Sequence, residues 1–368
     1  MASMPRVLVI TPDFPPAKGG IQILSHRVVS SLRALEPTVV TLGHADATAF
    51  DAQQGFRVVR TLATPGTRTF AIAGLNATAA VIGLRERPDV VLSTHIVAGP
   101  AAALLRRRLG IPFVQYVHAK EVGARPGLAR FALTRADRVI AVSRYTRGLA
   151  VTAGANPARV ALINPGVDLP AVASIEREQR GPPTLLTISR LEDRYKGHDV
   201  VLRALPLVRL HVPDVRWRVI GDGPLRPTLE ERARTMGLGD SVQFLGLVSD
   251  EVRDRELAGA NVFCMVSRIP ADGFAGEGFG IVYLEANAFG LPVVAGATGG
   301  AVDAVVPGET GLLVDPEDHV AVADAVVALL LDRDLANRLG RGGRARAERL
   351  TWEATARSVE GELLSLVA

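Results

Sequence analysis

The residues with the clearest chemical signature are two glutamates eight positions apart. Glu277 and Glu285 are the first and last residues of the run Glu-Gly-Phe-Gly-Ile-Val-Tyr-Leu-Glu. In one continuous helix they would lie ~12 Å apart along the axis, at a rise of about 1.5 Å per residue. That exceeds the roughly 5–9.5 Å that separates two carboxylates cleaving a glycoside together. The spacing therefore predicts two separate roles, with each carboxylate binding a different end of one extended ligand.

The residues between the glutamates could bind an anion. We expect Glu277 to precede a helix whose first turn is formed by Gly278 to Val282. The first amides of a helix have no partner inside it, and the helix dipole attracts negative charge there. The amides expected to contact a phosphate are those of Phe279, Gly280, Ile281 and Val282.

Two cations follow the apolar run TLLTIS in the second half of the chain. Arg190 ends this run, and Lys196 precedes a predicted helix. Like charges are costly to crowd together unless an anion lies between them, and a diphosphate is the simplest such partner. The two side chains could neutralise charge on a departing nucleotide diphosphate, which is the task of a metal ion in other transferases.

The first half contains two further candidates, each at the end of a predicted strand. Gly19 and Gly20 lie directly before a helix expected to begin at about Ile21, where backbone amides can approach a phosphate. The alternative is that these glycines only form a turn. His118 ends the run FVQYV and could bind a sugar hydroxyl or exchange a proton, although a purely structural histidine is also consistent with the sequence.

Several classes of site find no support in the sequence. Neither G-x-G-x-x-G after a strand nor G-x-x-x-x-G-K-[ST] occurs, which disfavours dehydrogenases and P-loop enzymes. The seven histidines lack metal-ligand spacing, and Asp332-Arg333-Asp334 matches D-x-D only inside a predicted helical region. Cys264 lies in an apolar run and is interpreted as a core thiol. We therefore predict no metal and no cofactor.

The elements needed to position these residues form two α/β units. Apolar runs that read as buried parallel strands alternate with helical patterns: RVLVI, TVV, RVV, DVVLS, FVQYV and RVIAV, then TLLTIS, WRVIG, VQFLG, NVFCMV, LPVVAG and GLLVD. A turn-rich stretch after Asn164 separates the two sets. This pattern predicts two doubly wound domains, residues 1–166 and 167–350, facing across a cleft lined by the loops after the strands. A terminal helix over about 351–368 is expected to pack back on the first domain.

The charge is distributed unevenly over these domains. The chain has a net charge of +4, but residues 1–166 hold 20 basic and 8 acidic residues. Ten basic residues fall in 100–147 alone, among them Arg106, Arg107, Arg108, Arg125, Arg130, Arg135 and Arg138. Such a density predicts weak, salt-sensitive peripheral contact of the first domain with an anionic membrane, with a solvated arginine-rich face as the alternative. A single cysteine and the lack of a long apolar run predict a cytoplasmic protein, with the inner face of the plasma membrane as its place of contact.

Taken together, these motifs resemble retaining GT-B glycosyltransferases of family 4. Glu277 and Glu285 match that family's E-x7-E motif, and GEGFGIVYLEANAFGLPVVAGATGG is similar to it throughout. TPDFPPAKGGIQ, His118, Arg190 with Lys196-Gly197, GDGP at 221–224 and FLGLVSDEV fall in the family's order, so the resemblance covers nearly the whole chain. DFPPAKGGIQ and GFGIVYLEA most resemble the mannosyltransferases that extend phosphatidylinositol mannosides from GDP-mannose. One departure is Ala119, where many relatives have glycine.

The resemblance implies a role for each candidate residue. Glu277 would contact hydroxyls of the donor sugar, Glu285 the ribose, and Arg190 with Lys196 the diphosphate. Gly19, Gly20 and His118 would line the same site, and Val248 lies in the loop that would meet the nucleobase through main-chain groups. The expected reaction is transfer of a hexose, mannose being one candidate, from a GDP- or UDP-linked donor to a glycan or glycolipid acceptor.

Two other classes of function stay open at the level of sequence. A nucleotide-sugar epimerase or another non-transferase GT-B enzyme would share the architecture. A nucleic-acid-binding protein is suggested by the basic first half, but aromatic residues make up only 5% of the chain and no nucleic-acid-binding module is present. We therefore expect no nucleic-acid partner.

Overall fold

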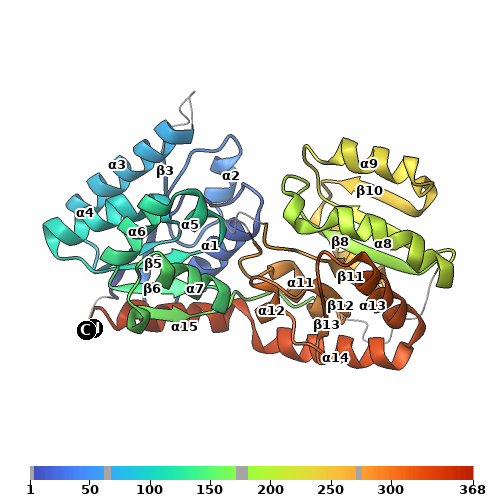
Figure 1. Ribbon diagram of the computed structural model, residues 1–368. Helices are drawn as coiled ribbons and strands as arrows, with labels where there is room; N and C mark the ends of the chain where they lie inside the picture. The colour runs from blue at the N-terminus through green and yellow to red at the C-terminus, as the bar shows by residue number, and fades with distance from the viewer. Residues whose placement is uncertain (1–3, 62–67, 171–180, 271–275, 368) are drawn as a thin grey trace. The chain divides into compact units, whose positions relative to one another are not determined.

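The computed structural model of the protein describes residues 4–61, 68–170, 181–270 and 276–367. The chain divides into two compact units (Figure 1). Unit 1 consists of residues 1–166 with 352–368, and unit 2 consists of residues 167–351.

Unit 1 is built on a seven-stranded parallel sheet in the order β3-β2-β1-β4-β5-β6-β7. Its strands are β1 Arg6–Ile10, β2 Glu36–Thr41, β3 Arg57–Arg60, β4 Val90–Ser93, β5 Phe113–Val117, β6 Arg138–Ala141 and β7 Val160–Leu162. The central strands β4 and β5 are buried at every position and are mainly apolar, with Ser93 and Gln115 as their polar residues. Such strands need helices on the sheet to cover them.

The helical segments of unit 1 connect these strands and include the end of the chain. They are α1 Gly20–Ser30, α2 Ala47–Asp51, α3 Arg68–Glu86, η1 Ile96–Ala98, α4 Gly99–Leu109, α5 Lys120–Ala124, α6 Pro126–Arg135, α7 Arg144–Thr152, η2 Pro157–Arg159 and α15 Trp352–Leu364. The core between the sheet and its helices is mainly aliphatic, with Leu75, Leu105 and the aromatic Phe113 among its fully buried members.

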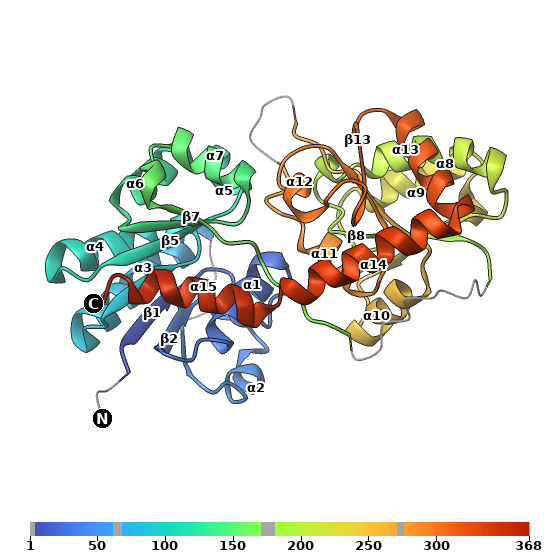
Figure 2. The same ribbon diagram turned by 90° about the horizontal axis from the view of Figure 1, so that it is seen from below.

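The C-terminal helix α15 packs beside α1 in unit 1 (Figure 2). The carboxylate of Glu360 accepts hydrogen bonds from the amides of Arg33 and Ala34, at 2.8 and 2.5 Å, just beyond the end of α1. Glu362 pairs with Arg138 at the start of β6. These contacts attach the C-terminal helix to the first half of the chain.

Unit 2 is built on a six-stranded parallel sheet in the order β10-β9-β8-β11-β12-β13. Its strands are β8 Thr184–Ile188, β9 Arg216–Ile220, β10 Val242–Gly246, β11 Val262–Met265, β12 Val293–Gly296 and β13 Gly311–Val314. Its core includes the fully buried Trp217, whose indole NH donates to Thr187.

The helical segments of unit 2 are η3 Arg194–Lys196, α8 His198–His211, α9 Arg226–Thr235, η4 Gly239–Ser241, α10 Asp250–Gly259, α11 Ile281–Ala288, α12 Ala301–Ala304, α13 His319–Leu331 and α14 Arg333–Arg349. Side chains cap several of them, as expected for Ser and Asp at a helix start. Asp332 accepts from the amide of Leu335 and so begins α14, which gives the first aspartate of the D-x-D match a structural role.

The two parallel-sheet, Rossmann-like units confirm the predicted fold class. Each apolar run predicted to be a strand forms one, from β1 to β6 and from β8 to β13. β7 was not predicted from the sequence, because it has three residues and is only half-buried.

Candidate active site

The candidate residues of unit 2 follow the carboxyl ends of its strands. Because all of these strands are parallel, their carboxyl ends share one edge of the sheet, where ligands of open α/β sheets bind. Arg190 comes after β8, Val248 after β10, and Glu277 between β11 and α11. Lys196 ends η3, the short turn between β8 and α8.

The central contact at this edge is an ion pair between Lys196 and Glu277. Lys196 Nζ donates to Glu277 Oε2 over 2.5 Å, and each side chain is 14% exposed. The ammonium also lies 5.0 Å from the centre of the Tyr195 ring. Burial works to lower the pKa of Lys196, but the charge of Glu277 and the contact with Tyr195 raise it above its usual value. Lys196 therefore stays charged over the physiological pH range.

The backbone at Glu277 is fixed by the turn that precedes α12. The amide of Gly300 donates to the carbonyl oxygen of Glu277 over 2.7 Å. A Cβ at position 300 would lie 2.0 Å from the carbonyl oxygen of Gly278, so only glycine permits this approach. Glu277 is thus fixed twice: its backbone by the hydrogen bond from Gly300, and its carboxylate by the ion pair with Lys196.

The helix after Glu277 begins later than the sequence pattern predicts. Gly278 to Val282 were expected to form its first turn, but α11 begins at Ile281, with Gly280 as its N-cap at φ +91°. The reason is local, since glycines at 278 and 280 favour an irregular turn over helix. The amides that open the helix are consequently those of Ile281 and Val282, while Phe279 is 3% exposed and packs into the core.

Glu285 lies in the second turn of α11, and its charged neighbours differ from those of Glu277. Burial raises its pKa, the nearby Arg253 lowers it, and the acidic neighbours Asp168, Asp254 and Asp250 raise it again, with a net upward shift. Arg253 itself pairs with two of these carboxylates. The second glutamate of the motif therefore has an environment distinct from that of the first.

Arg190 is more exposed than the sequence argument suggests. Its side chain is 62% exposed and pairs with Glu192 at 3.2 Å. Each cation has its own carboxylate partner, Glu192 for Arg190 and Glu277 for Lys196, and binding of a diphosphate by the two cations stays a prediction.

The loop after β10 presents main-chain groups beside the end of β9. The amide of Gly221 donates to the carbonyl oxygen of Gly246 over 2.9 Å. Val248 follows and is half-buried, whereas Leu247 between them is 75% exposed. An exposed leucine at such a position offers an apolar surface to a planar ring.

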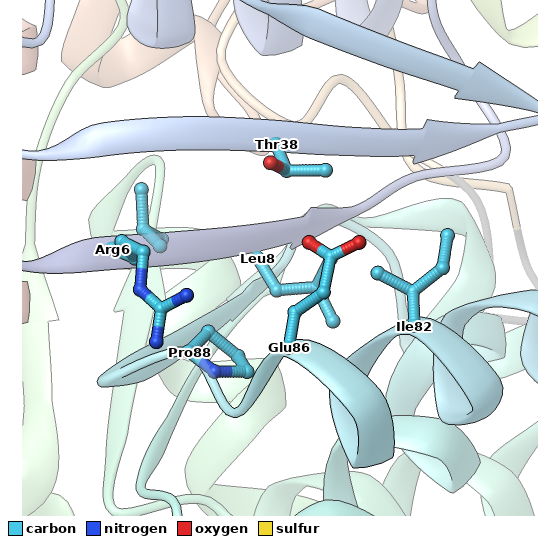
Figure 3. A pocket seen from close by; sticks show the side chains of 7 residues that line it. Arg6, Leu8, Thr38, Ile82, Glu86 and Pro88 are labelled. Carbon is cyan, nitrogen blue, oxygen red and sulfur yellow. The ribbon is translucent and has the colours of Figure 1, made fainter.

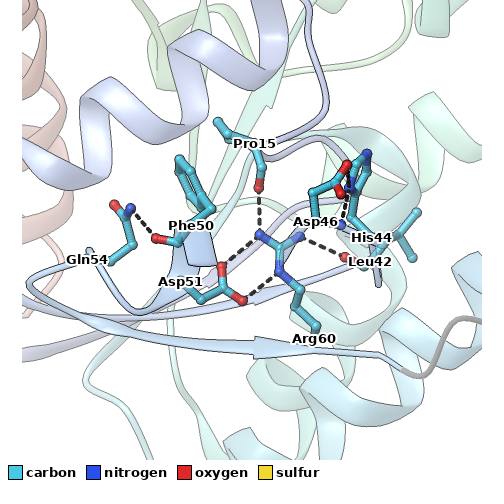
Figure 4. Close-up of polar contacts among 8 residues, drawn as sticks. All are labelled: Pro15, Leu42, His44, Asp46, Phe50, Asp51, Gln54 and Arg60. Atoms are coloured by element: carbon cyan, nitrogen blue, oxygen red, sulfur yellow. Dashed lines mark hydrogen bonds and ion pairs between the residues drawn. The ribbon is translucent and has the colours of Figure 1, made fainter. Parts of the chain in front are cut away.

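In unit 1, the loop after β1 is held by a buried arginine (Figure 4). Arg60, at the end of β3, makes two hydrogen bonds of 2.8 Å to the carboxylate of Asp51 and donates to the carbonyl oxygens of Pro15 and Leu42. Its side chain is 11% exposed. The loop carrying Pro15 leads directly into Gly19, the N-cap of α1, so Arg60 ties the glycine turn to β3 and α2.

His118 follows β5 and is 8% exposed. Its Nε2 lies 3.0 Å from the carbonyl oxygen of Thr94, and its backbone amide donates to Glu121 over 2.6 Å. The ring stacks on that of Tyr116, with 6.0 Å between the centroids. These contacts give the histidine a fixed orientation, as both a structural and a functional role require.

Two further residues at the strand ends of unit 1, His95 and Asp13, were not predicted from the sequence as site residues. His95 follows β4, the strand between β1 and β5, and Asp13 follows β1. Burial lowers the pKa of His95 to about 4, against the opposing charge of Asp13 and with a contribution from His118 in the same direction. The signal was available, because His95 comes after the strand DVVLS just as His118 comes after FVQYV.

A small cavity elsewhere in unit 1 contains none of the candidate residues. It has a volume of about 20 Å³ and is lined by Arg6, Thr38, Glu86 and Pro88, near the amino ends of β1, β2 and β4 (Figure 3). Ligands of such sheets bind at the opposite, carboxyl ends. We therefore assign no role in the reaction to this cavity.

The structure also bears on three other kinds of feature: the cysteine, groups of metal-ligating side chains, and membrane-spanning helices. Cys264 is fully buried in β11, and burial raises its pKa to about 12, as expected of a core thiol. Within the described ranges, no three His, Cys, Asp or Glu side chains are grouped so that they could hold a metal ion. No described helix is both long and apolar enough to cross a membrane.

Comparison with known families matches both halves of the chain. Residues 18–170 match the family described as Glycosyltransferase Family 4, and residues 172–346 match the one described as Glycosyl transferases group 1. The chain is 37% identical to the GDP-mannose-dependent alpha-(1-6)-phosphatidylinositol monomannoside mannosyltransferase of Mycolicibacterium smegmatis, over 92% of each chain. It is 31% identical to a Corynebacterium glutamicum mannosyltransferase acting on the monoacylated form, over 96% of each.

Solved structures share the fold at lower identity. Anabaena HepE, in complex with UDP and glucose, superposes with a TM-score of 0.80 at 20% identity, over 98% of this chain and 100% of that one. Sucrose-phosphate synthase from Thermosynechococcus elongatus gives 0.82 at 24% identity, over 99% and 98%. From the family matches, the similar relatives and this shared two-domain fold, the chain is identified as a member of glycosyltransferase family 4 and as a glycosyltransferase.

Proposed function

We propose that this glycosyltransferase moves mannose from GDP-mannose to a phosphatidylinositol mannoside or a related glycolipid, with retention of anomeric configuration and without a metal ion. The relatives that are 31–37% identical over more than 90% of the chain are named for this donor and this class of acceptor. The single structural observation behind the proposal is the buried Lys196–Glu277 pair at the carboxyl edge of the sheet in unit 2.

The pair places a fixed positive charge beside a carboxylate, which suits a sugar diphosphate. An ammonium has three donors, and Glu277 occupies one of them, so Lys196 can also donate to a phosphate oxygen. Glu277 keeps an oxygen for a hydroxyl of the sugar. The leaving diphosphate then gains charge next to Lys196, with Arg190 as a second, exposed cation, and no metal or other cofactor is needed.

Other residues of unit 2 would bind the rest of the donor. The opening amides of α11, at Ile281 and Val282, suit phosphate oxygens. Glu285 would accept hydrogen bonds from the ribose, and the loop containing Val248 would contact the guanine. In unit 1, His118 and the turn at Gly19-Gly20 are assigned to the transferred sugar and the acceptor.

A panel of donors and acceptors tests the proposal. Purified protein is incubated with GDP-mannose, UDP-glucose or UDP-galactose and with phosphatidylinositol or its monomannoside, and lipid products are separated by mass. The proposal expects a gain of one hexose only with GDP-mannose and the mannosylated lipid. Conversion of the nucleotide sugar to an epimer, with no change in the lipid, would instead assign the epimerase reaction.

We further propose that unit 1 docks on anionic membranes to reach this lipid. Arg107 and Arg108 are exposed in the last turn of α4, which packs on α6 with its exposed Arg130. Other arginines of the basic stretch are already engaged: Arg106 pairs with Asp137, and Arg135 lies over the ring of Phe131. The basic charge free for lipid is therefore smaller than the sequence count suggests.

Vesicle sedimentation at low and high salt tests the docking. Each basic residue near an anionic surface contributes about 1 kcal/mol, so Arg107→Glu with Arg108→Glu should abolish most of a weak, salt-sensitive attachment. Arg203→Glu on an exposed position of unit 2 is the control. Equal recovery of the wild-type protein with neutral and anionic vesicles would refute the docking.

A further inference from the structure

The segment that carries Lys196 is held by hydrogen bonds and close contacts from the residues that follow β11. We call residues 195–199 the lysine segment. The backbone amide of Arg268, three residues beyond the end of β11, donates to the carbonyl oxygen of Tyr195 over 2.8 Å. The guanidinium of Arg268 donates from its two terminal nitrogens to the carboxylate of Asp199, at 3.0 and 3.2 Å. Both ends of the lysine segment are therefore attached to the same residue.

The middle of the lysine segment lies against the same stretch of backbone. Gly197 has φ +80°, and a Cβ at this position would lie 2.2 Å from the carbonyl oxygen of Val266. Such an approach leaves no room for a side chain or for a sliding movement of one backbone over the other. Contacts at 195, 197 and 199 thus fix the height of Lys196 above the sheet.

Arginine is the residue type that this arrangement requires. The guanidinium is 14% exposed and uses a third nitrogen, Nε, to pair with Glu317 at 3.2 Å, while its two terminal nitrogens serve Asp199. A planar fork matches a carboxylate with two parallel hydrogen bonds, whereas an ammonium offers only a point charge at the end of a flexible chain. Lysine at 268 would keep the charge and lose the geometry.

We propose that Arg268 is a positioning residue for diphosphate binding. It does not touch the donor, and acts by holding the lysine segment so that the Lys196 ammonium meets the diphosphate. This inference rests on the proposed function, in which Lys196 binds that group. It predicts that damage to Arg268 appears as a loss specific to the phosphates and not to the nucleoside.

Calorimetric titration with GDP and with guanosine provides the test. For Arg268→Lys we expect roughly tenfold weaker binding of GDP, the lower end of what losing one charged hydrogen bond costs, with guanosine affinity unchanged. Arg218→Lys is the matched control, because Arg218 forms a 2.6 Å ion pair with the buried Glu256 in the same unit. It should leave the affinities for both ligands unaltered.

A second variant guards against simple unfolding. Asp199→Asn removes the negative charge that binds the Arg268 guanidinium and leaves Arg268 itself unchanged. This variant should show the same loss of GDP affinity, with guanosine affinity unchanged. Equal losses for GDP and guanosine in both variants, or no loss in either, would overturn the positioning role. If the wild-type protein binds neither ligand, the proposed function fails instead, so the two failures are distinguishable.

Discussion

A donor that binds through its diphosphate must share Lys196 with Glu277, because the two side chains form a 2.5 Å ion pair. Each residue was expected at the site from the sequence, but the pairing was not. They lie 81 positions apart, and no local pattern reports a contact between such distant residues. The structural roles of Arg60 and Arg268 could not be predicted from the sequence either, since they are two among 39 arginines.

Lys196→Ala should weaken binding of GDP by roughly ten- to hundredfold and binding of guanosine much less, because its partner in the ligand is phosphate. Calorimetry with both ligands measures the difference. Arg194→Ala, an exposed basic residue of the same short helix, is the control and should alter neither affinity. An unchanged GDP affinity in Lys196→Ala would remove the lysine from the site.

Glu277→Gln keeps the shape of the side chain and removes its charge. Turnover should fall at least about tenfold, because a charged hydrogen bond to the sugar is lost, whereas GDP affinity should not fall, since Lys196 is left without a competing carboxylate. Steady-state kinetics and GDP titration of one preparation give both values. A parallel loss of GDP affinity would mean that Glu277 binds the nucleotide.

The environment of Glu285 predicts a pH dependence of nucleoside binding. Burial raises the pKa of this carboxyl above its ordinary value of 4.5 despite the opposing charge of Arg253. Ribose hydroxyls donate to the ionised form, so guanosine affinity should decline as the pH falls through the raised pKa, beginning above pH 4.5. Guanosine is the appropriate ligand because it carries no titrating phosphate. In Glu285→Gln the affinity should be lower and independent of pH over this range, and a persisting pH dependence would assign the effect to another group.

At the scale of elements, the strands were predictable and the glycine-rich turns were not. Strands buried on both faces are continuous apolar runs, which is why β4, β5 and β11 were found from sequence. β7 was missed because Val160–Leu162 is short and half-exposed. The start of α11 was placed too early because the glycines at 278 and 280 favour an irregular turn over helix, and Gly280 adopts φ +91° as the N-cap.

The attachment of the loop after β1 to β3 and α2 predicts a strong coupling between Arg60 and Asp51. Arg60→Met leaves a partly buried carboxylate unpaired, so the free energy of unfolding should drop by about 3 kcal/mol. Adding Asp51→Leu removes that unpaired charge and should recover much of the loss. Urea unfolding of the wild-type protein, both single variants and the double variant gives a double-mutant cycle, which measures the coupling energy between Arg60 and Asp51.

The exposed pair Arg57–Glu86 serves as the reference for this cycle. Its side chains are 57% and 36% exposed, and exposed pairs contribute about 0–1 kcal/mol. Arg57→Met should therefore have little effect on unfolding. If the effects of the Arg60 and Asp51 substitutions simply add, the buried pair does not anchor the loop.

At the scale of the whole molecule, alternating strands and helices predicted two Rossmann-like domains, and the structure and the shared fold confirm them. Membership of family 4 was predicted from the E-x7-E segment and its neighbours, and the family matches confirm it. Donor, acceptor and stereochemistry depend on side-chain contacts with ligands, which no pattern of apolar residues encodes.

The most direct measurement is a proton NMR time course of GDP-mannose with a soluble analogue of the mannosylated acceptor, in excess chelator. A new mannosidic anomeric signal of α configuration, the same as in the donor, is expected to grow as GDP accumulates. The chelator should not slow it, because Lys196 and Arg190 supply the positive charge at the leaving group. A product of β configuration, or activity that requires added magnesium, would contradict the account.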